Sequence, residues 1–354
     1  MENIHVDLGP KSYDIEVERG SWPHLGTRIR SLSKADKVAV ITDSTVDGLY
    51  GAQLETQLKA QGFEVRRLVF PAGEDHKNLE TFGRMVRNCA DFGMTRKDLV
   101  ITLGGGVTGD MGGYVAASFL RGVAFIQIPT TLLSQIDSSV GGKVAVDLPE
   151  GKNLVGSFYQ PKAVLMDPDL LDTLDPRYVH DGLAEVIKCA AFGDPELFAK
   201  LEAYKDDRDM LDHVTDIIAH CCRLKVKVVE EDETDVGARM VLNFGHTIGH
   251  AVERFYHYEK YTHGEGVAIG MVRLTRNTER LGLTVPGTAD RIQRLLAKYH
   301  IPTEDPIGDK AVLEGIAMDK KKRGNEITLV IVPEIGKSML KKVAVADLQP
   351  YIKG

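Results

Sequence analysis

Two histidines stand four residues apart in the segment "NFGHTIGHAVE", residues 243–253. On a helix, residues four apart lie on one face with their β-carbons about 6 Å apart, so the imidazoles of His246 and His250 can converge on a single zinc ion. A zinc peptidase of the H-E-x-x-H type would need glutamate where Thr247 stands. The spacing therefore permits a metal site and excludes that class of peptidase.

A third histidine and a carboxylate extend the candidate metal site. His263 precedes the apolar run "GEGVAIGM", and Glu185 lies among apolar residues in "GLAEVIK". An unpaired buried charge is costly, so Glu185 needs a partner. One carboxylate and two histidines around a divalent metal, with one position open, are typical of a catalytic site. The alternative is that Glu185 pairs with Lys188 and the histidines make ordinary helix contacts.

A glycine-rich segment, "DLVITLGGGVTGDMGGYVAA", sets Gly104, Gly106 and Gly109 in G-x-G-x-x-G register between a predicted strand and a predicted helix. Glycines let the backbone approach a pyrophosphate, whose charge is met by amide N–H groups at the start of the helix. The alternative is a tight turn that only packs the helix on the sheet. The acid expected about twenty residues downstream in dinucleotide folds is missing, because "AFIQIPT" stands there.

Other strand ends offer that acid. Asp43 closes the predicted strand 37–43, and "PAGEDHK" supplies Glu74 and Lys77 after the next strand. Ligands bind at the carboxyl ends of strands in open α/β sheets, although each of these residues alone is also typical of a solvated loop. "SSVGGKVAV" is not a phosphate-binding P-loop, because Val144 follows the lysine where serine or threonine is required.

Several charged residues and an asparagine lie in the connections after the glycine loop. They are Arg121, Asp137, Lys143, Lys152 and Asn153. Lysines gathered in such loops of an acidic chain favour a pocket for a small anion, although single surface lysines are usually only solvated.

Apolar periodicity predicts the elements that must position these residues. Strands alternating with helices up to about residue 170 predict a mostly parallel sheet covered on both faces, an α/β Rossmann-like nucleotide-binding domain over 1–170. A hairpin opens the chain, and a second hairpin is expected near residues 327–343. Residues 171–354 otherwise show helical spacing, which predicts a mainly α-helical domain carrying the metal and substrate residues.

Composition limits the classes of function. The formal charge of −7 over 354 residues argues against a nucleic-acid surface. No segment is long and apolar enough to cross a bilayer, and the first twenty residues lack the apolar core of a secretory signal, so we expect a cytoplasmic protein. The four cysteines form no C-x-x-C pair, which predicts reduced thiols without a catalytic role.

Taken together, "GGGVTGD", "IPTTLLSQIDSSVGGKVAVDLPEGKNLVGSFYQP", "GLAEVIK", "LNFGHTIGHAVE" and "HGEGVAIGM" resemble the 3-dehydroquinate synthase family over nearly the whole chain. The resemblance implies a homodimeric enzyme that uses NAD and a divalent metal, zinc or cobalt. It converts 3-deoxy-D-arabino-heptulosonate 7-phosphate into 3-dehydroquinate and phosphate in the shikimate pathway. The steps implied are transient oxidation at C5, β-elimination of phosphate, reduction, ring opening and aldol closure.

The resemblance also implies a role for individual residues. The metal ligands are Glu185, His246 and His263, and His250 faces the substrate instead. The NAD site comprises Asp43, Glu74, Lys77, Gly104, Gly105, Gly106, Gly109, Asp110, Thr130, Thr131, Lys143, Lys152 and Thr173. The substrate and catalytic residues are Arg121, Asp137, Lys143, Lys152, Asn153, Lys188, Lys225, Arg239, Asn243, His250 and Lys320, with Arg121 reaching across from a second subunit.

Two positions depart from the family pattern, and other functions remain open. Asp235 stands where many members have glutamate, and the run "MDKKKRGNE" leaves the register of Lys320 against Lys321 uncertain. The rivals are another sugar-phosphate cyclase, a metal-dependent polyol dehydrogenase and an inactive nucleotide-binding regulator. Lys225, Arg239 and Asn243, with His250 and Lys320, suit a substrate that bears both a carboxylate and a phosphate, which favours the 3-dehydroquinate synthase reaction.

Overall fold

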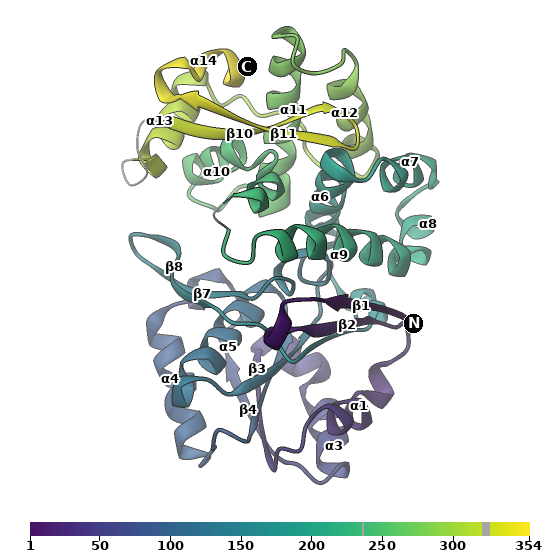
Figure 1. Cartoon of the computed structure of the whole chain (residues 1–354), viewed down its shortest axis with the longest axis vertical. Coiled ribbons are helices and arrows are strands. Elements are labelled where there is room, and N and C mark those ends of the chain that lie inside the picture. Colours follow the sequence, from purple (N-terminus) through teal and green to yellow (C-terminus); the bar gives the residue numbers. More distant parts are fainter. Residues whose placement is uncertain (236, 321–325) are drawn as a thin grey trace. The chain divides into compact units, whose positions relative to one another are not determined.

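The computed structural model describes residues 1–235, 237–320 and 326–354, with backbone alone for 317–320. The chain forms two compact units, Met1–Leu174 and Asp175–Gly354 (Figure 1). The boundary expected at residue 170 falls inside the 3-10 helix η7 (Pro168–Thr173). The first unit is α/β and the second is mainly helical, which confirms the predicted fold class.

The first unit is built on a seven-stranded sheet in the order β1-β2-β9-β6-β5-β3-β4. All neighbouring strands are parallel except β1 and β2, which form the predicted antiparallel hairpin. Parallel strands end at a common edge, so the residues that follow them gather there. The strands are β1 (Glu2–Val6), β2 (Tyr13–Val17), β3 (Lys37–Asp43), β4 (Glu64–Phe70), β5 (Leu99–Gly104), β6 (Ala124–Pro129) and β9 (Ala163–Met166).

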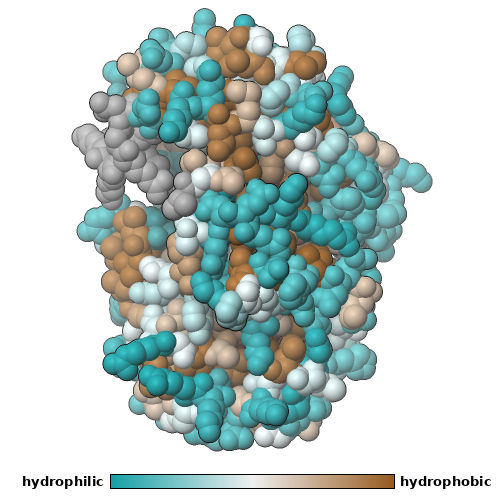
Figure 2. All heavy atoms as spheres, viewed as in Figure 1, coloured by the Kyte–Doolittle hydropathy of each residue, from teal (hydrophilic) through white to brown (hydrophobic). Residues whose placement is uncertain are grey.

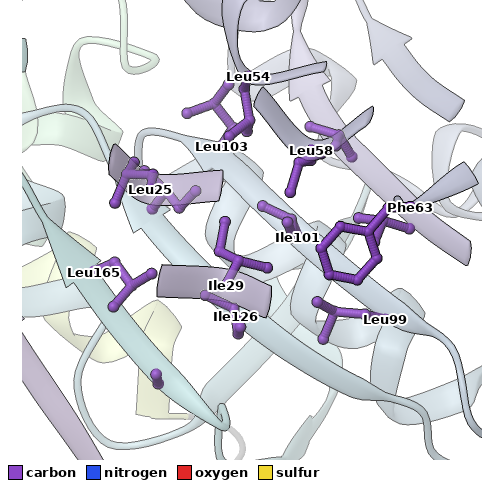
Figure 3. Close-up of a cluster of buried hydrophobic side chains, with 14 of the residues drawn as sticks. Leu25, Ile29, Leu54, Leu58, Phe63, Leu99, Ile101, Leu103, Ile126 and Leu165 are labelled. Atoms are coloured by element: carbon purple, nitrogen blue, oxygen red, sulfur yellow. The ribbon is translucent and has the colours of Figure 1, made fainter. Parts of the chain in front are cut away.

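Helices cover the two faces of this sheet because its central strands are apolar on both sides. On one face, α1 (Leu25–Leu32) and α3 (Ala52–Ala60) bury Ile29 and Leu58 against Ile101 of β5 (Figure 3). On the other face, α4 (Leu79–Asp91) and α5 (Gly106–Ser118) contribute side chains to a second core cluster with residues of β3 and β4. Continuous apolar strands such as β5 are the ones that periodicity predicts best.

A second hairpin in the first unit was not predicted. The segment expected to be glycine-rich connections instead forms β7 (Lys143–Leu148) and β8 (Gly151–Phe158), which pair antiparallel. Strand β7 contributes the buried Val144 and Val146 to the core beside α5, whereas β8 is largely exposed. Lys143, Lys152 and Asn153 are therefore strand residues, a correction to their expected position in loops.

The second unit consists of helices and one hairpin. Its longer helices are α6 (Pro176–Gly193), α7 (Pro195–Ala203), α9 (Val214–Glu231), α10 (His246–Phe255), α11 (His263–Arg280), α12 (Thr288–Lys298) and α13 (Asp309–Lys320), and its short ones are α8 (Asp207–Asp212) and α14 (Gln349–Ile352). The strands β10 (Glu326–Glu334) and β11 (Lys337–Ala344) form the hairpin predicted near the C-terminus. Helix α13 was not predicted.

The histidine segment is not one continuous helix, contrary to the expectation from its apolar spacing. The 3-10 helix η8 (Ala238–Asn243) ends before Phe244, and α10 begins at His246. Between them Gly245 has a φ of 80°, a left-handed conformation that favours glycine. His246 is therefore the first residue of α10, and His250 lies one turn later on the same helix.

The helices, the surface and the cysteines can be compared with what the composition predicted. No helix among the described residues is long and apolar enough to span a membrane. Hydrophilic residues spread over the face in Figure 2, between smaller hydrophobic areas. The cysteines Cys89, Cys189, Cys221 and Cys222 are buried and form no disulfide among the described residues, and burial raises the pKa of the Cys89 thiol to about 11. Such a thiol stays protonated near neutral pH, so it is a poor nucleophile.

Candidate active site

The glycine loop of the first unit leaves the start of α5 open to an anion. Helix α5 begins at Gly106, and its N-cap residue Gly105 has no side chain to accept hydrogen bonds from the first turn. The first amide to donate within the helix is that of Gly109, to the Gly105 carbonyl at 3.0 Å. The preceding amides have no intrahelical acceptor, and a pyrophosphate oxygen suits them.

Two of the glycines are also required for packing. A β-carbon on Gly104 would lie 2.5 Å from Thr108 Oγ1, and one on Gly109 would lie 2.9 Å from Gln127 Oε1. Around Gly105 and Gly106 the nearest atoms, on Thr131 and Ser138, would be 3.1 Å away. The loop therefore satisfies the packing alternative at Gly104 and Gly109 and still has the form of a phosphate-binding turn.

Asp43 lies beside this loop. Its Oδ1 caps the short helix α2 (Ser44–Val46), accepting hydrogen bonds from the amides of Thr45 and Val46 at 2.9 and 3.1 Å. Its Oδ2 accepts a hydrogen bond from the Thr108 hydroxyl at 3.3 Å. The structure therefore brings the carboxyl end of β3 and the first turn of α5 together, as strand order predicts.

Lys77 is the centre of a buried polar cluster. Only 3% of the residue is exposed, and its Nζ donates to Asp110 Oδ2 at 2.5 Å and to Asn153 Oδ1 at 2.6 Å. Burial opposes its charge, but the carboxylates of Asp110 and Glu74 raise the pKa of Lys77 above its usual value. Burial likewise opposes the charge of Glu74, but Lys77 and Lys152 lower its pKa. Lys77 therefore stays protonated and joins the candidate residues of α5 to those of β8.

Glu74 and Lys152 form the rim of this cluster. The Nζ of Lys152 lies 3.3 Å from Glu74 Oε1, and both side chains are about two-fifths exposed. Asp147 of β7, which sequence reasoning missed, accepts a hydrogen bond from the Asn153 amide at 2.7 Å, and its own amide donates to the Lys77 carbonyl at 2.8 Å. Asp147 thereby ties the β7–β8 hairpin to the segment that holds Lys77.

Among the remaining candidates of the first unit, Thr130 and Thr131 lie beside the glycine loop, and the others lie in different elements. The amide of Thr130 donates to the Gly104 carbonyl at 3.0 Å, and Thr131 exchanges hydrogen bonds with Ser134. Thr173 Oγ1 lies 2.6 Å from the hydroxyl of Tyr50. Asp137 lies in the π-helix η6 (Ser134–Ser138), Lys143 opens β7, and Arg121 ends the 3-10 helix η5 (Phe119–Arg121) with a φ of 66°. That Arg121 acts across a dimer stays a prediction.

Three histidines of the second unit meet at one point. The rings of His246 and His250 have centroids 5.2 Å apart, and those of His246 and His263 are 5.1 Å apart. One nitrogen of each of the three rings lies within 4.8 Å of those of the other two. The predicted convergence of His246 and His250 on one helical face is therefore real, and α11 adds His263 to it.

Glu185 completes this cluster from α6. It is fully buried, and its Oε1 lies 4.0 Å from His263 Nε2 without a hydrogen-bond partner among the described residues. Its Oε2 accepts a hydrogen bond from the buried Nζ of Lys188. The alternative of a Glu185–Lys188 pair is therefore correct for one oxygen, whereas the other oxygen faces the histidines and has no hydrogen-bond partner among the residues that the structure describes.

Hydrogen bonds orient two of the rings. His246 Nδ1 lies 3.1 Å from the Phe244 carbonyl, and His263 Nδ1 lies 3.4 Å from Glu253 Oε1. The Phe244 carbonyl can only accept a hydrogen bond, so it places the proton of His246 on Nδ1 and leaves its Nε2 free to bind a metal. Burial keeps the pKa of His246 well below its usual value, so this ring is neutral, as a metal ligand must be.

The pKa of His263 shifts in the opposite direction from that of His246. Burial favours its neutral form, but the hydrogen bond to Glu253 and the charges of Glu185, Glu253 and Asp181 raise its pKa to about 9. The nearby carboxylates therefore favour a positive charge at this position, which a divalent cation would also supply. One carboxylate oxygen and two imidazole nitrogens fit the donor set of a catalytic zinc site.

Glycines bring the helices close enough to form the cluster. Helix α11 packs against both α10 and α6. A β-carbon on Gly249 would lie 2.9 Å from the Gly266 carbonyl oxygen, and one on Gly270 would lie 2.0 Å from the Gly245 carbonyl oxygen. The start of α11 is fixed to α6, because the Gly264 amide donates to Asp181 Oδ1 at 2.6 Å.

The predicted substrate residues of the second unit differ in exposure. Lys188, Lys225 and Arg239 are buried, whereas Asn243 and His250 are exposed. Lys320 ends α13, and its side chain lies outside the described residues, as do Lys321 and the rest of 321–325. Arg239 is held by its backbone, whose amide donates to Asp232 Oδ2 at 3.1 Å, and by Nη1, which donates to the Glu233 carbonyl at 3.0 Å.

Sequence reasoning missed two carboxylates of this site, Asp181 and Glu253. A signal was present, because Glu253 follows His246 by seven residues and so returns to the same face of α10. Asp181 precedes Glu185 by four residues on α6, which likewise places both on one face. Acids at such spacings are common on helices, so only the fold separates these two from the others.

Solved structures of two synthases share this fold. One is a 2-deoxy-scyllo-inosose synthase complexed with carbaglucose-6-phosphate, NAD⁺ and Co²⁺, with a TM-score of 0.89, 24% identity and 99% of each chain covered. The other is the 2-epi-5-epi-valiolone synthase ValA of Streptomyces hygroscopicus subsp. jinggangensis 5008 with NAD⁺ and Zn²⁺ bound. It matches with a TM-score of 0.85 and 26% identity, over 95% of this chain and 94% of that one. The chain therefore shares the fold of these two synthases.

The sequence is closer to another synthase. Residues 67–181 match the family model of the 3-dehydroquinate synthase N-terminal part, and residues 182–322 match that of its C-terminal part. The curated 3-dehydroquinate synthase of Clostridium acetobutylicum is 50% identical over 354 residues, covering 100% of this chain and 99% of its own length. The chain belongs to the 3-dehydroquinate synthase family, which confirms the resemblance seen in its motifs.

Proposed function

We propose that the protein converts 3-deoxy-D-arabino-heptulosonate 7-phosphate into 3-dehydroquinate and phosphate, with NAD and a zinc or cobalt ion as cofactors. Family membership and 50% identity to a curated 3-dehydroquinate synthase support this activity. The structural observation that carries it is Glu185 Oε1, which faces the histidine cluster without a hydrogen-bond partner among the described residues.

The metal ligands we propose are Glu185, His246 and His263. The geometry also permits His250 in place of Glu185, because all three histidines converge. We prefer Glu185 because a buried carboxylate oxygen without a partner is costly, whereas the exposed His250 can be hydrated. His250 then remains available to the substrate as a general acid or base.

The nucleotide would bind at the glycine loop of the first unit. The open first turn of α5, with Gly105 and Gly106, suits the pyrophosphate of NAD. We assign the full set named from the resemblance to this function, including Asp43, Glu74, Lys77 and Asp110. Lys77 orders this region, because it holds Asp110 of α5 and Asn153 of β8 together.

The cofactors and the protein would divide the chemistry. Bound at the glycine loop, NAD would supply a reversible hydride acceptor for C5, and a metal held by Glu185, His246 and His263 would supply a Lewis acid for the C5 hydroxyl. Because the hydride would return to C5 within the same cycle, no net oxidation would result. The C5 ketone acidifies the proton on C6, and its loss expels phosphate by β-elimination. Reduction of C5, ring opening and intramolecular aldol addition then form the carbocycle.

Basic side chains would bind the anionic groups of the substrate. The residues proposed for this are Arg121, Lys143, Lys152, Lys188, Lys225, Arg239 and Lys320, with Asp137, Asn153, Asn243 and His250 as further polar contacts. Lysine and arginine neutralise a leaving phosphate and hold the reacting atoms in place, which are the main contributions we expect from the protein.

A related cyclase acting on another sugar phosphate is the second candidate, because two such synthases share the fold. Their identities to this chain are 24% and 26%, against 50% for the curated 3-dehydroquinate synthase. The sequence comparison therefore supports the heptulosonate substrate. As the family resemblance implies, we further propose a cytoplasmic homodimer, whose mass in solution should be about twice the 38.9 kDa of one chain.

Substitutions distinguish the proposed metal ligands from His250, the proposed substrate residue. Glu185→Ala and His263→Ala should each lose bound metal, because each removes one of three ligands. His250→Ala should retain the metal and lose about a hundredfold or more of its turnover, the usual contribution of a general acid or base. Metal content after dialysis, measured by elemental analysis, checks this. Normal metal content in either ligand variant, or metal loss in His250→Ala, would contradict the assignment.

A further inference from the structure

Glu253 contacts the proposed ligand His263 and is none of the metal, cofactor or substrate residues proposed above. It is on the same face of α10 as His246 and His250, and only 4% of the residue is exposed. A carboxylate at that depth needs a compensating partner, since burial without one is costly. The described contact that provides one is with His263.

The contact engages the nitrogen that faces away from Glu185. Glu253 Oε1 lies 3.4 Å from Nδ1 of His263, a long hydrogen bond, whereas Glu185 Oε1 lies 4.0 Å from Nε2 of the same ring. Each nitrogen of His263 therefore faces a different carboxylate. A ring donating from Nδ1 to Glu253 presents the lone pair of Nε2 towards Glu185, the orientation that a shared metal ion requires.

The packing around Glu253 keeps its side chain in this place. Gly266 lies on α11, one turn after His263, and a β-carbon there would be 3.0 Å from Glu253 Cγ. A β-carbon at this position would require the Glu253 side chain to shift by a few tenths of an ångström. The close approach of α10 and α11 along Gly249 and Gly266 therefore serves both the histidine cluster and its supporting carboxylate.

We propose that Glu253 is a positioning residue, which fixes the tautomer and ring orientation of His263 so that Nε2 binds the metal. This inference rests on the metal site of the proposed function and adds a residue to it. A simpler role would be charge balance alone, in which Glu253 only neutralises a protonated His263. The positioning role requires a hydrogen-bond acceptor at the same place as the Glu253 carboxylate. Charge balance requires only a negative charge at residue 253.

Two conservative variants separate these roles. Glu253→Gln removes the charge and keeps an acceptor oxygen on a side chain of the same length. Glu253→Asp keeps the charge on a side chain that is shorter by one methylene. For a positioning residue, Glu253→Gln should bind Zn²⁺ within a few-fold of the parent, and Glu253→Asp should bind it about 10- to 100-fold more weakly, the usual effect of losing such a partner. Charge balance predicts the reverse order.

The measurement is the Zn²⁺ dissociation constant of the full-length protein, by competition with a chromophoric chelator and without substrate. Co²⁺ absorption spectra report the ligand geometry independently, and Glu253→Asp should alter them. Glu259→Gln, at an exposed position just beyond α10, is the matched control and should bind as the parent does. Circular dichroism of the metal-free variants shows whether they are folded.

Equal affinity in both Glu253 variants and the parent, or weaker binding by Glu253→Gln than by Glu253→Asp, would overturn the positioning role while leaving the metal site intact. A parent protein that binds neither ion would instead overturn the metal site, and the positioning role with it.

Discussion

At the scale of single residues, Glu185 explains how a buried site can be prepared for a cation. Its Oε2 accepts a hydrogen bond from Lys188, whereas its Oε1 faces His263 and has no hydrogen-bond partner among the described residues. Desolvating a carboxylate is costly, and one hydrogen bond from a buried lysine compensates only part of that cost. A divalent ion between Oε1 and the imidazoles would supply the rest, which makes metal affinity the property most sensitive to this residue.

A residue outside the sites shows how carboxylates contribute to stability through pH. Asp98 is 4% exposed and accepts hydrogen bonds from the amides of Thr95 and Lys37, at 2.6 and 2.9 Å. Burial opposes its charge, but these hydrogen bonds lower its pKa below the ordinary value of 3.8. Its stabilisation is therefore complete above the unfolded pKa and is lost as the pH falls through the lower folded pKa.

Asp98→Asn should accordingly lower the free energy of unfolding by roughly 2 kcal/mol near neutral pH, because charged acceptors form the stronger hydrogen bonds. The difference from the parent should shrink as the pH falls below the ordinary aspartate pKa and through the lower folded pKa of Asp98. Urea unfolding of both proteins across this range measures it. Asp91→Asn, an exposed substitution at the end of α4, is the control. A difference that does not change with pH would contradict the assignment.

At the scale of elements, the distance between α10 and α11 decides whether the histidines can meet. The glycines at positions 245 and 249 lie against those at 266 and 270, with carbonyl groups where side chains would otherwise be. Helices packed this closely bring residues near their N-termini, His246 and His263, within 5.1 Å between ring centroids. The glycines therefore act on metal binding through geometry and not by contact with the ion.

Gly270→Ala tests this packing. Its β-carbon would lie 2.0 Å from the Gly245 carbonyl oxygen, so the helices must separate. We expect a loss of about 1–3 kcal/mol in the free energy of unfolding, together with weaker metal binding. Gly83→Ala is the matched control, because that helical glycine of α4 has only the Arg87 guanidinium nearby, at 3.7 Å, and alanine there should stabilise by up to about 1 kcal/mol. Equal effects of the two substitutions would show that helix propensity, not packing, governs Gly270.

The elements differ in how far their sequences reveal them. Strand β3 begins and ends where predicted, because an apolar run bounded by polar residues marks a buried strand clearly. The β7–β8 hairpin was missed because its glycines, lysines and asparagine are typical of loops, and its pairing depends on packing against α5. The break before His246 was missed because only the left-handed conformation of Gly245 interrupts otherwise helical spacing.

The site was predictable in a similarly uneven way. Spacing alone suggested His246 and His250, and the resemblance to a family added Glu185 and His263 as ligands. Neither source identified Glu253, since its role depends on α11 approaching α10. Contacts between helices distant in sequence are set by the fold, so residues that act through another residue remain hidden at the sequence level.

At the scale of the whole molecule, the buried basic residues contrast with the net negative charge of the chain. The chain carries a formal charge of −7, yet Lys77, Lys188, Lys225, Arg239 and Arg273 are the buried basic residues among those described. Arg273 has a structural role, because it binds the carbonyls of Ile352 and Ile307 and the carboxylate of Asp309. The other four were all named as cofactor or substrate residues. Two of them already bind carboxylates of the chain, Lys77 that of Asp110 and Lys188 that of Glu185. Much of the buried positive charge is therefore balanced within the chain.

The most direct test of the central claim is turnover of the purified protein with 3-deoxy-D-arabino-heptulosonate 7-phosphate, NAD and Zn²⁺ or Co²⁺. Released phosphate and the 3-dehydroquinate formed are measured together with the absorbance of NADH. The account predicts equal amounts of phosphate and 3-dehydroquinate, metal-dependent rates and no lasting rise in NADH, because the hydride returns within each cycle. Stoichiometric accumulation of NADH, or no phosphate release with metal and NAD present, would contradict it.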